Sequence, residues 1–193
     1  MTAKLENLHS AAAERASEAL SKLVGRPAHI EVVRAEIKPV TELAPAVGLE
    51  EVVVGVCLPV TGDVTGASLL VFPKGSALVL SDLLAGREPG TTTALSGLDE
   101  SALKEVGNIL TGAYLTVLAD VSGMRLVEHV PHLTCDMFGA VASQIVANLA
   151  QEDAEALIVE VEFLFRQPVF KNYLILFFGT EDARKVFPAM ALA

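Results

Sequence analysis

The chain of 193 residues is 52% hydrophobic and 20% charged, a balance that supports a sizeable folded core and excludes an intrinsically disordered protein. The formal net charge is −10 and no Lys/Arg cluster stands out, which excludes a nucleic-acid partner, because such a surface repels phosphate backbones. Apolar runs stay well short of the roughly 18 residues of a membrane-spanning helix, and the N-terminus has no signal-peptide core, so we expect a cytoplasmic protein without membrane insertion.

The first part of the chain predicts a helix, three strands and a second helix. The expected elements are a helix over 5–24, a strand over 28–40, strands over 51–60 and 66–72, and a helix over 75–86. Gly25 ends the first helix, and the turn sequence "TGDVTG" predicts a hairpin between the second and third strands. A segment rich in Gly, Thr and Pro follows over 87–97 and marks the main break.

The second part repeats this order of elements. The expected elements are a helix over 99–121, a strand over 124–133, a helix over 135–150, strands over 156–165 and 172–178, and a helix over 180–190. "ALSKLVGRPAHIEVV" aligns with "VLADVSGMRLVEHVP", which places Gly25 over Gly123. We therefore predict a single α+β domain over 1–193, made of two degenerate halves of about 1–88 and 97–193 related by a pseudo-two-fold repeat, with one antiparallel β-sheet and helices packed on it.

The cysteines and histidines form no recognisable metal-binding pattern. Cys57 and Cys135 lie far apart and are expected to be buried free thiols. His129, His132 and Cys135 are three residues apart, but on a strand followed by a turn this spacing scatters the side chains, and no fourth ligand is evident. We therefore predict no metal site.

The helix over 99–121 places two polar groups on the face away from the core. The residues expected on the core face are Leu103, Val106, Leu110 and Val117. The residues expected on the opposite face are Ser101, Glu105, Asn108 and Gly112. Because Gly112 leaves the surface beside the pair bare, a partner protein could approach closely there.

Two interpretations of Glu105 and Asn108 are open from their spacing. Such residues are common on solvated helix faces, and the pair alone does not indicate catalysis. A carboxamide can also hold a water in a chosen orientation, and a carboxylate one turn away can bind a basic side chain of a docked protein. Together they could aim a water at the phosphoryl group of a phosphoprotein, a reaction governed by positioning and electrostatics.

Four residues with a fixed spacing favour the second interpretation. Ser101, Glu105, Asn108 and Pro131 match the pattern Asp or Ser, three residues, Glu, two residues, Asn, twenty-two residues, Pro, in which the chain resembles the CheC/CheX/FliY family of chemotaxis phosphatases. The segments "EVGNILTGAYL" and "PVTGDVTGASLL" are similar to CheC beyond this motif, and the resemblance covers nearly the whole chain. It implies a CheC-like fold and a phosphatase that acts on a phosphorylated CheY-like response regulator.

The resemblance implies a role for each motif residue. Asn108 would orient the attacking water, and Glu105 would pair with the active-site lysine of the regulator. Ser101 would support the helix start or the docking edge, and Pro131, with its fixed φ, would hold the following strand in register. The regulator would supply its own Mg²⁺, so no cofactor of this chain is expected.

The same pattern is absent from the first half. Through the repeat the motif falls on Ala3, Asn7, Ser10 and Val33, which provide neither the carboxylate nor the amide nor the proline. We therefore predict one functional site, in the second half.

CheC-like proteins also imply CheD, a receptor deamidase, as a partner. Asp136, five residues beyond Pro131, matches the acidic contact of the family, although an Asp near a helix start also suits the helix dipole. The alternative function is a non-enzymatic CheC-like adaptor that binds CheD or a flagellar switch component.

Overall fold

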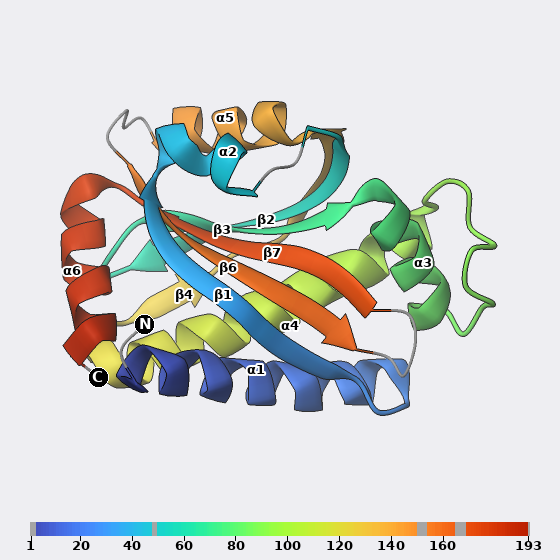
Figure 1. Ribbon diagram of the computed structural model, residues 1–193, viewed down its shortest axis with the longest axis horizontal. Helices are drawn as coiled ribbons and strands as arrows, with labels where there is room; N and C mark the ends of the chain where they lie inside the picture. The colour runs from blue at the N-terminus through green and yellow to red at the C-terminus, as the bar shows by residue number, and fades with distance from the viewer. Residues whose placement is uncertain (1–2, 48–49, 150–153, 165–168, 193) are drawn as a thin grey trace.

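The computed structural model describes residues 3–47, 50–149, 154–164 and 169–192, which form one sheet with helices on both faces (Figure 1). The elements in chain order are α1 (Ala3–Val24), β1 (His29–Pro39), the 3-10 helix η1 (Val40–Glu42), α2 (Leu43–Val47), β2 (Val52–Gly62), β3 (Gly66–Pro73), α3 (Lys74–Leu84), α4 (Gly97–Ser122), β4 (Leu126–Glu128), β5 (His132–Met137), α5 (Phe138–Leu149), β6 (Glu155–Leu164), β7 (Val169–Phe178) and α6 (Thr180–Leu192).

The sheet interleaves strands from the two parts of the chain. Seven strands of the described residues pair in the order β1-β6-β7-β3-β2-β4, and β5 also pairs with β2. Each of these pairs is antiparallel, which confirms the predicted sheet, and β2 and β3 form the predicted hairpin. If β1 is exchanged with β4 and β5, β2 with β6, and β3 with β7, the same strand order is obtained from the opposite edge of the sheet. The division into two halves itself stays a prediction.

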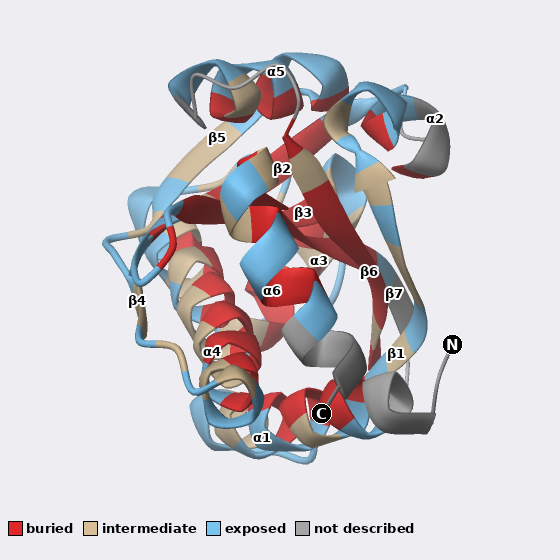
Figure 2. Cartoon of the chain, turned by 90° about the vertical axis from the view of Figure 1, so that its left-hand side faces the viewer, coloured by how far each residue is buried: buried red, intermediate tan, exposed pale blue. Residues whose placement is uncertain are grey.

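The central strands are buried on both faces. Leu70 and Phe72 of β3 point into the core under α1, α3, α4 and α6, whereas Leu69 and Val71 point into a second core under α2 and α5. Successive side chains of a strand face opposite ways, so a strand covered on both sides is apolar throughout. In Figure 2 the central strands β2, β3 and β6 and the inward sides of the helices are accordingly coloured as buried.

Helix α4 lies between the sheet and solvent, beside α1 and antiparallel to it (Figure 1). It begins with a capping box in which Ser96 accepts the Asp99 N–H and the Asp99 carboxylate accepts the Ser96 N–H. It ends at Gly123, whose φ of 69° suits glycine. Gly107 faces β2, where a Cβ atom would lie 2.5 Å from Val56 Cγ1. The glycine therefore lets the helix approach the sheet closely.

The segment before α4 is organised around a buried carboxylate that sequence reasoning missed. Asp82 of α3 is fully buried and accepts hydrogen bonds from the backbone N–H groups of Gly90, Thr91 and Thr92. Arg87 connects Asp82 to Asp99 at the start of α4. Burial acts to raise the pKa of Asp82, but the hydrogen bonds from Thr92, Thr91 and Gly90 outweigh it and hold that pKa well below its usual value. The charged group thereby fixes the N-terminal end of α4.

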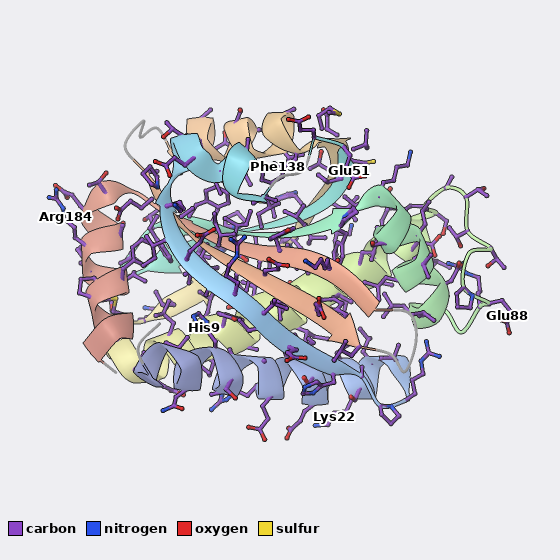
Figure 3. The ribbon with its side chains drawn as sticks, viewed as in Figure 1. His9, Lys22, Glu51, Glu88, Phe138 and Arg184 are labelled. Atoms are coloured by element: carbon purple, nitrogen blue, oxygen red, sulfur yellow. The ribbon has the colours of Figure 1, made fainter. Side chains whose placement is uncertain are left out.

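Two predicted boundaries after α4 are wrong. The strand expected over 124–133 is divided into β4 and β5, and both pair with β2. Pro131 lies in the connection, where a residue without an N–H cannot continue the strand ladder. The helix expected from Cys135 begins at Phe138, which is buried between α5 and the sheet (Figure 3). Asp136 is therefore a strand residue opposite Val53.

The prediction that both cysteines are buried is also wrong. Both are free thiols, but Cys135 is exposed and Cys57 is half-buried. Cys135 belongs to β5, at the edge of the sheet, and its burial was predicted because the two cysteines have neither metal-binding nor redox spacing. No helix in the described ranges is both long and apolar enough to cross a membrane.

Candidate functional site

The exposed face of α4 carries Glu105 and Asn108 as the helical spacing predicts. Glu105 is exposed and Asn108 is half-buried. Leu103, Val106 and Leu110 on the opposite face are fully buried. The side chains of the pair are thus presented at the surface from a helix whose other face is fixed in the core.

The two side chains interact directly. Asn108 Nδ2 donates a hydrogen bond to Glu105 Oε2 over 3.3 Å. This is a long hydrogen bond between exposed groups, so a competing donor can break it at little cost. The second amide hydrogen and Oδ1 of Asn108 have no hydrogen-bond partner among the described residues. The amide can therefore still hold a water as donor and acceptor.

The structure separates the other predicted site residues. Ser101 is exposed and its hydroxyl donates to the Gly97 carbonyl over 2.8 Å, within the first turns of α4. Pro131 is half-buried in the connection between β4 and β5. Asp136 is exposed on β5, and its carboxylate accepts the Met137 N–H over 2.7 Å. Ser101 thus shares the surface of the pair, whereas Asp136 belongs to another part of the molecule.

The register of β2 shows how far apart these regions lie. Val53 is opposite Asp136, and Val60 is opposite Glu128 of β4. Seven residues along a strand correspond to about 23 Å. A protein bound at Asp136 would therefore contact a region distinct from the one beside Glu128.

Glu128 is a neighbour of Gly112, one helical turn after Asn108, that the sequence did not reveal. Its Oε1 atom lies 3.2 Å from the position that a Cβ atom on Gly112 would occupy. We expected the surface at Gly112 to be bare, but a carboxylate covers it. The contact depends on how β4 pairs with β2, a long-range register that local sequence patterns do not specify.

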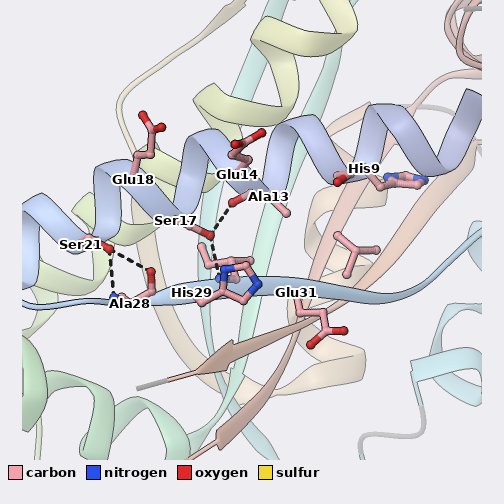
Figure 4. A pocket seen from close by; sticks show the side chains of 12 residues that line it. His9, Ala13, Glu14, Ser17, Glu18, Ser21, Ala28, His29 and Glu31 are labelled. Atoms are coloured by element: carbon pink, nitrogen blue, oxygen red, sulfur yellow. Dashed lines mark hydrogen bonds between the residues drawn. The ribbon is translucent and has the colours of Figure 1, made fainter. Parts of the chain in front are cut away.

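Helix α1, on which the predicted repeat places the degenerate motif, has different contacts. Asn7 and Ser10 of α1 are exposed, Val33 of β1 is exposed, and the Ala3 side chain lies outside the described part. A groove of about 790 Å³ runs between α1 and β1 (Figure 4). Ser17 Oγ accepts the Ile30 N–H over 2.8 Å within this groove. This helix face therefore satisfies the backbone of an edge strand, and no residue of α4 lines the groove.

A buried polar contact joins the two long helices. His9 Nδ1 of α1 lies 3.3 Å from the Tyr114 hydroxyl of α4, and both side chains are buried. Burial lowers the pKa of His9 to about 4, so the imidazole is neutral at pH 7. His9 therefore acts as a packing contact that holds α4 against α1.

One histidine after α4 contacts a threonine side chain. His129 Nε2 lies 2.7 Å from Thr61 Oγ1. Over the ranges that the structure describes, no three His, Cys, Asp or Glu side chains gather as a metal-binding set.

Comparisons with known proteins agree with this fold and this helix. A model of the CheC-like family matches residues 98–128, which include Ser101, Glu105 and Asn108. The protein named CheY-P phosphatase CheC of Bacillus subtilis (strain 168) is 30% identical over 191 residues, covering 96% of this chain and 91% of that protein. The chain belongs to the CheC-like family.

Solved structures support the fold of this CheC-like chain. The crystal structure of Thermotoga maritima FliY is similar with a TM-score of 0.78 and 21% identity, covering 99% of this chain and 98% of that one. The CheX–CheY–BeF3–Mg complex of Borrelia burgdorferi contains a chain that is similar with a TM-score of 0.50 and 20% identity, covering 88% of this chain and 95% of that one.

Proposed function

We propose that this CheC-like protein is a phosphatase that removes the phosphoryl group from the phosphoaspartate of a CheY-like response regulator. The observation that carries the proposal is the Glu105–Asn108 pair on the exposed face of α4. The name of the Bacillus subtilis relative supports the activity, and the Borrelia burgdorferi complex supports CheY as the kind of partner. The surface of α4 suits a protein substrate, because the larger groove of the molecule lies elsewhere.

In this mechanism Asn108 holds the attacking water in line with the phosphorus atom. When Oδ1 and Nδ2 of a carboxamide both bind one water, these two contacts fix the direction of the water's lone pair. Phosphoryl transfer requires this positioning of the attacking water. We propose no cofactor of this chain; the Mg²⁺ of the regulator would neutralise charge on the phosphoryl oxygens.

Glu105 couples docking to the release of Asn108. In the free protein Glu105 Oε2 accepts the hydrogen bond from Asn108 Nδ2. A lysine of the regulator forms a charge-assisted hydrogen bond with the carboxylate, which is stronger than a neutral donor contact. Pairing of Glu105 with this lysine would therefore also release the amide hydrogen of Asn108 that Glu105 holds in the free protein.

The remaining motif residues have supporting roles in this proposal. Ser101 stabilises the first turns of α4 through its bond to Gly97, and Pro131, directly before β5, would hold that strand in register on β2. The first half has no equivalent pair, so one site is active. We also propose CheD as a second partner, because Asp136 is exposed and lies away from the catalytic helix.

Phosphate release from a phosphorylated CheY-like regulator tests the function. Wild type should accelerate release, and Asn108→Ala and Glu105→Ala should each reduce the acceleration on the order of 100-fold, the cost of losing positioning. Asn7→Ala on α1 is the matched control and should have wild-type activity. Failure of wild type with each regulator of its own organism would instead favour a non-enzymatic adaptor that binds CheD or a flagellar switch component.

A further inference from the structure

Glu128 adds a second carboxylate to the surface around Asn108. Val60 pairs with Glu128 and so fixes β4 beside α4. The Oε1 atom of Glu128 lies 3.2 Å from the Cβ position of Gly112, and Gly112 is one helical turn after Asn108 on the same face. Glu105 is one turn before Asn108. The amide therefore has a carboxylate on each side along the helix.

Gly112 is the residue that permits this arrangement. Glycine in the middle of a helix is unfavourable relative to alanine, so its presence in α4 requires a structural reason. A methyl group at this position would lie within 3.2 Å of the carboxylate oxygen, closer than ordinary packing allows. The missing side chain thus leaves room for Glu128 directly against the helix.

Glu128 has no ion-pair or hydrogen-bond partner in the part of the chain that the structure describes. Asp120, farther along α4, differs because it pairs with Arg15 over 3.5 Å. An unpaired carboxylate beside Asn108 would repel a phosphoryl group brought to that amide. A regulator that neutralises Glu128 with a cation of its own therefore docks more favourably than one that does not.

We propose that Glu128 is a specificity-determining residue of the phosphatase site, which selects regulators that carry a basic side chain opposite it. The inference rests on the proposed function. Glu105 receives the lysine of the regulator's active site, whereas Glu128 receives a second cation on the regulator's docking surface. Regulators with a neutral or acidic residue at that place are rejected by uncompensated charge.

The test uses the CheY-like regulator that wild type dephosphorylates fastest, with KM and kcat measured at low and high salt. Glu128→Gln should raise KM about 3- to 5-fold with kcat unchanged, as expected for one exposed charge pair. It should also weaken the salt dependence of kcat/KM. Glu128→Lys should raise KM further. Gly112→Ala should change KM in the same direction, and Gly112→Ala with Glu128→Gln should match Glu128→Gln alone, because both act through one carboxylate.

Asp120→Asn is the matched control, since it removes an equal charge from α4 and should leave KM unchanged. A wild-type KM and salt dependence in Glu128→Gln, or a fall in kcat alone, would overturn the inference while the proposed function stands. A binding measurement with the regulator in its beryllofluoride and Mg²⁺ form further separates the inference about Glu128 from the proposed function. If wild type binds without hydrolysis and Glu128→Gln weakens binding, the inference holds and the phosphatase proposal fails. If wild type neither binds nor hydrolyses, both fail.

Discussion

Gly107→Ala should destabilise the protein although alanine is the better helix former. A Cβ atom at this position would lie 2.5 Å from Val56 Cγ1 and 3.2 Å from Val56 Cβ. Ordinary carbon–carbon contacts are about 3.5–4.0 Å, so the overlap is about 1 Å. Val56 is β-branched and fully buried in β2, and it cannot rotate away. An overlap of this size with a side chain that cannot move costs about 2–3 kcal/mol, the upper part of the range for overpacking, against a gain in helix propensity of about 1 kcal/mol, which leaves a net loss of about 1–2 kcal/mol.

Urea unfolding and thermal melts would measure this loss, and the expected fall in Tm is about 2–8 °C. Gly112→Ala on the same helix is the control. Its nearest neighbour is the flexible end of Glu128, so its stability should stay equal or rise by up to about 1 kcal/mol. If Gly107→Ala is as stable as Gly112→Ala, the close approach of α4 to β2 does not exist as described.

Three further predictions concern ionisable groups. Burial lowers the pKa of His9 from 6.5 to about 4, so about 3 kcal/mol of the stability present above pH 6.5 is lost as the pH falls toward 4. His9→Gln should lack this part of the pH dependence when the free energy of unfolding is measured by urea titration. An unchanged dependence of that free energy on pH would refute the prediction. Asp82→Asn should lower the free energy of unfolding at pH 7 by about 2–4 kcal/mol, because the buried carboxylate loses charge-assisted hydrogen bonds. The lowered pKa means that the wild-type advantage declines as the pH falls below about 4, so a difference at pH 2 as large as the difference at pH 7 would contradict it. Exposed Cys135 should react with a thiol reagent faster than half-buried Cys57, because burial raises the pKa of Cys57 to about 11. Mass spectrometry of the modified peptides would measure both rates, and faster modification of Cys57 would contradict the prediction.

The sequence was sufficient for the parts of the fold that depend on local patterns. The burial of Leu103, Val106 and Leu110 follows from helical spacing, and the end of α4 at Gly123 follows from the freedom of glycine to adopt positive φ. The antiparallel sheet was expected because each of two repeated units would leave a sheet face uncovered, so that both would pair their strands around one core. The helix features require only information from neighbouring residues.

The boundaries around Pro131 required long-range information. The apolar alternation over 124–133 looks continuous, but the residues on each side of Pro131 pair separately with β2. Asp136 was placed near a helix start because the apolar residues after it have helical spacing. Pairing with Val53 instead extends β5 as far as Met137. A local pattern cannot reveal competition between two elements for the same residues.

The contacts around the candidate site were predicted only in part. The spacing of Glu105 and Asn108 placed both on one exposed face, and their hydrogen bond is a local contact. Glu128 and Asp82 were missed because each acts on α4 from a distant segment, one through strand register and the other through the loop over 87–97. Long-range carboxylates of this kind carry no signature in a single sequence.

The central claim is that Asn108 positions the attacking water, and single-turnover decay of a saturated regulator complex tests it most directly. At saturating concentrations of this protein, docking no longer limits the rate, so the decay constant reports the chemical step. Asn108→Ala should bind the phosphorylated regulator with an affinity close to that of wild type, and the acceleration of phosphoaspartate decay in this complex should fall on the order of 100-fold. Decay of the Asn108→Ala complex at the wild-type rate would contradict the assignment of Asn108 as the catalytic residue.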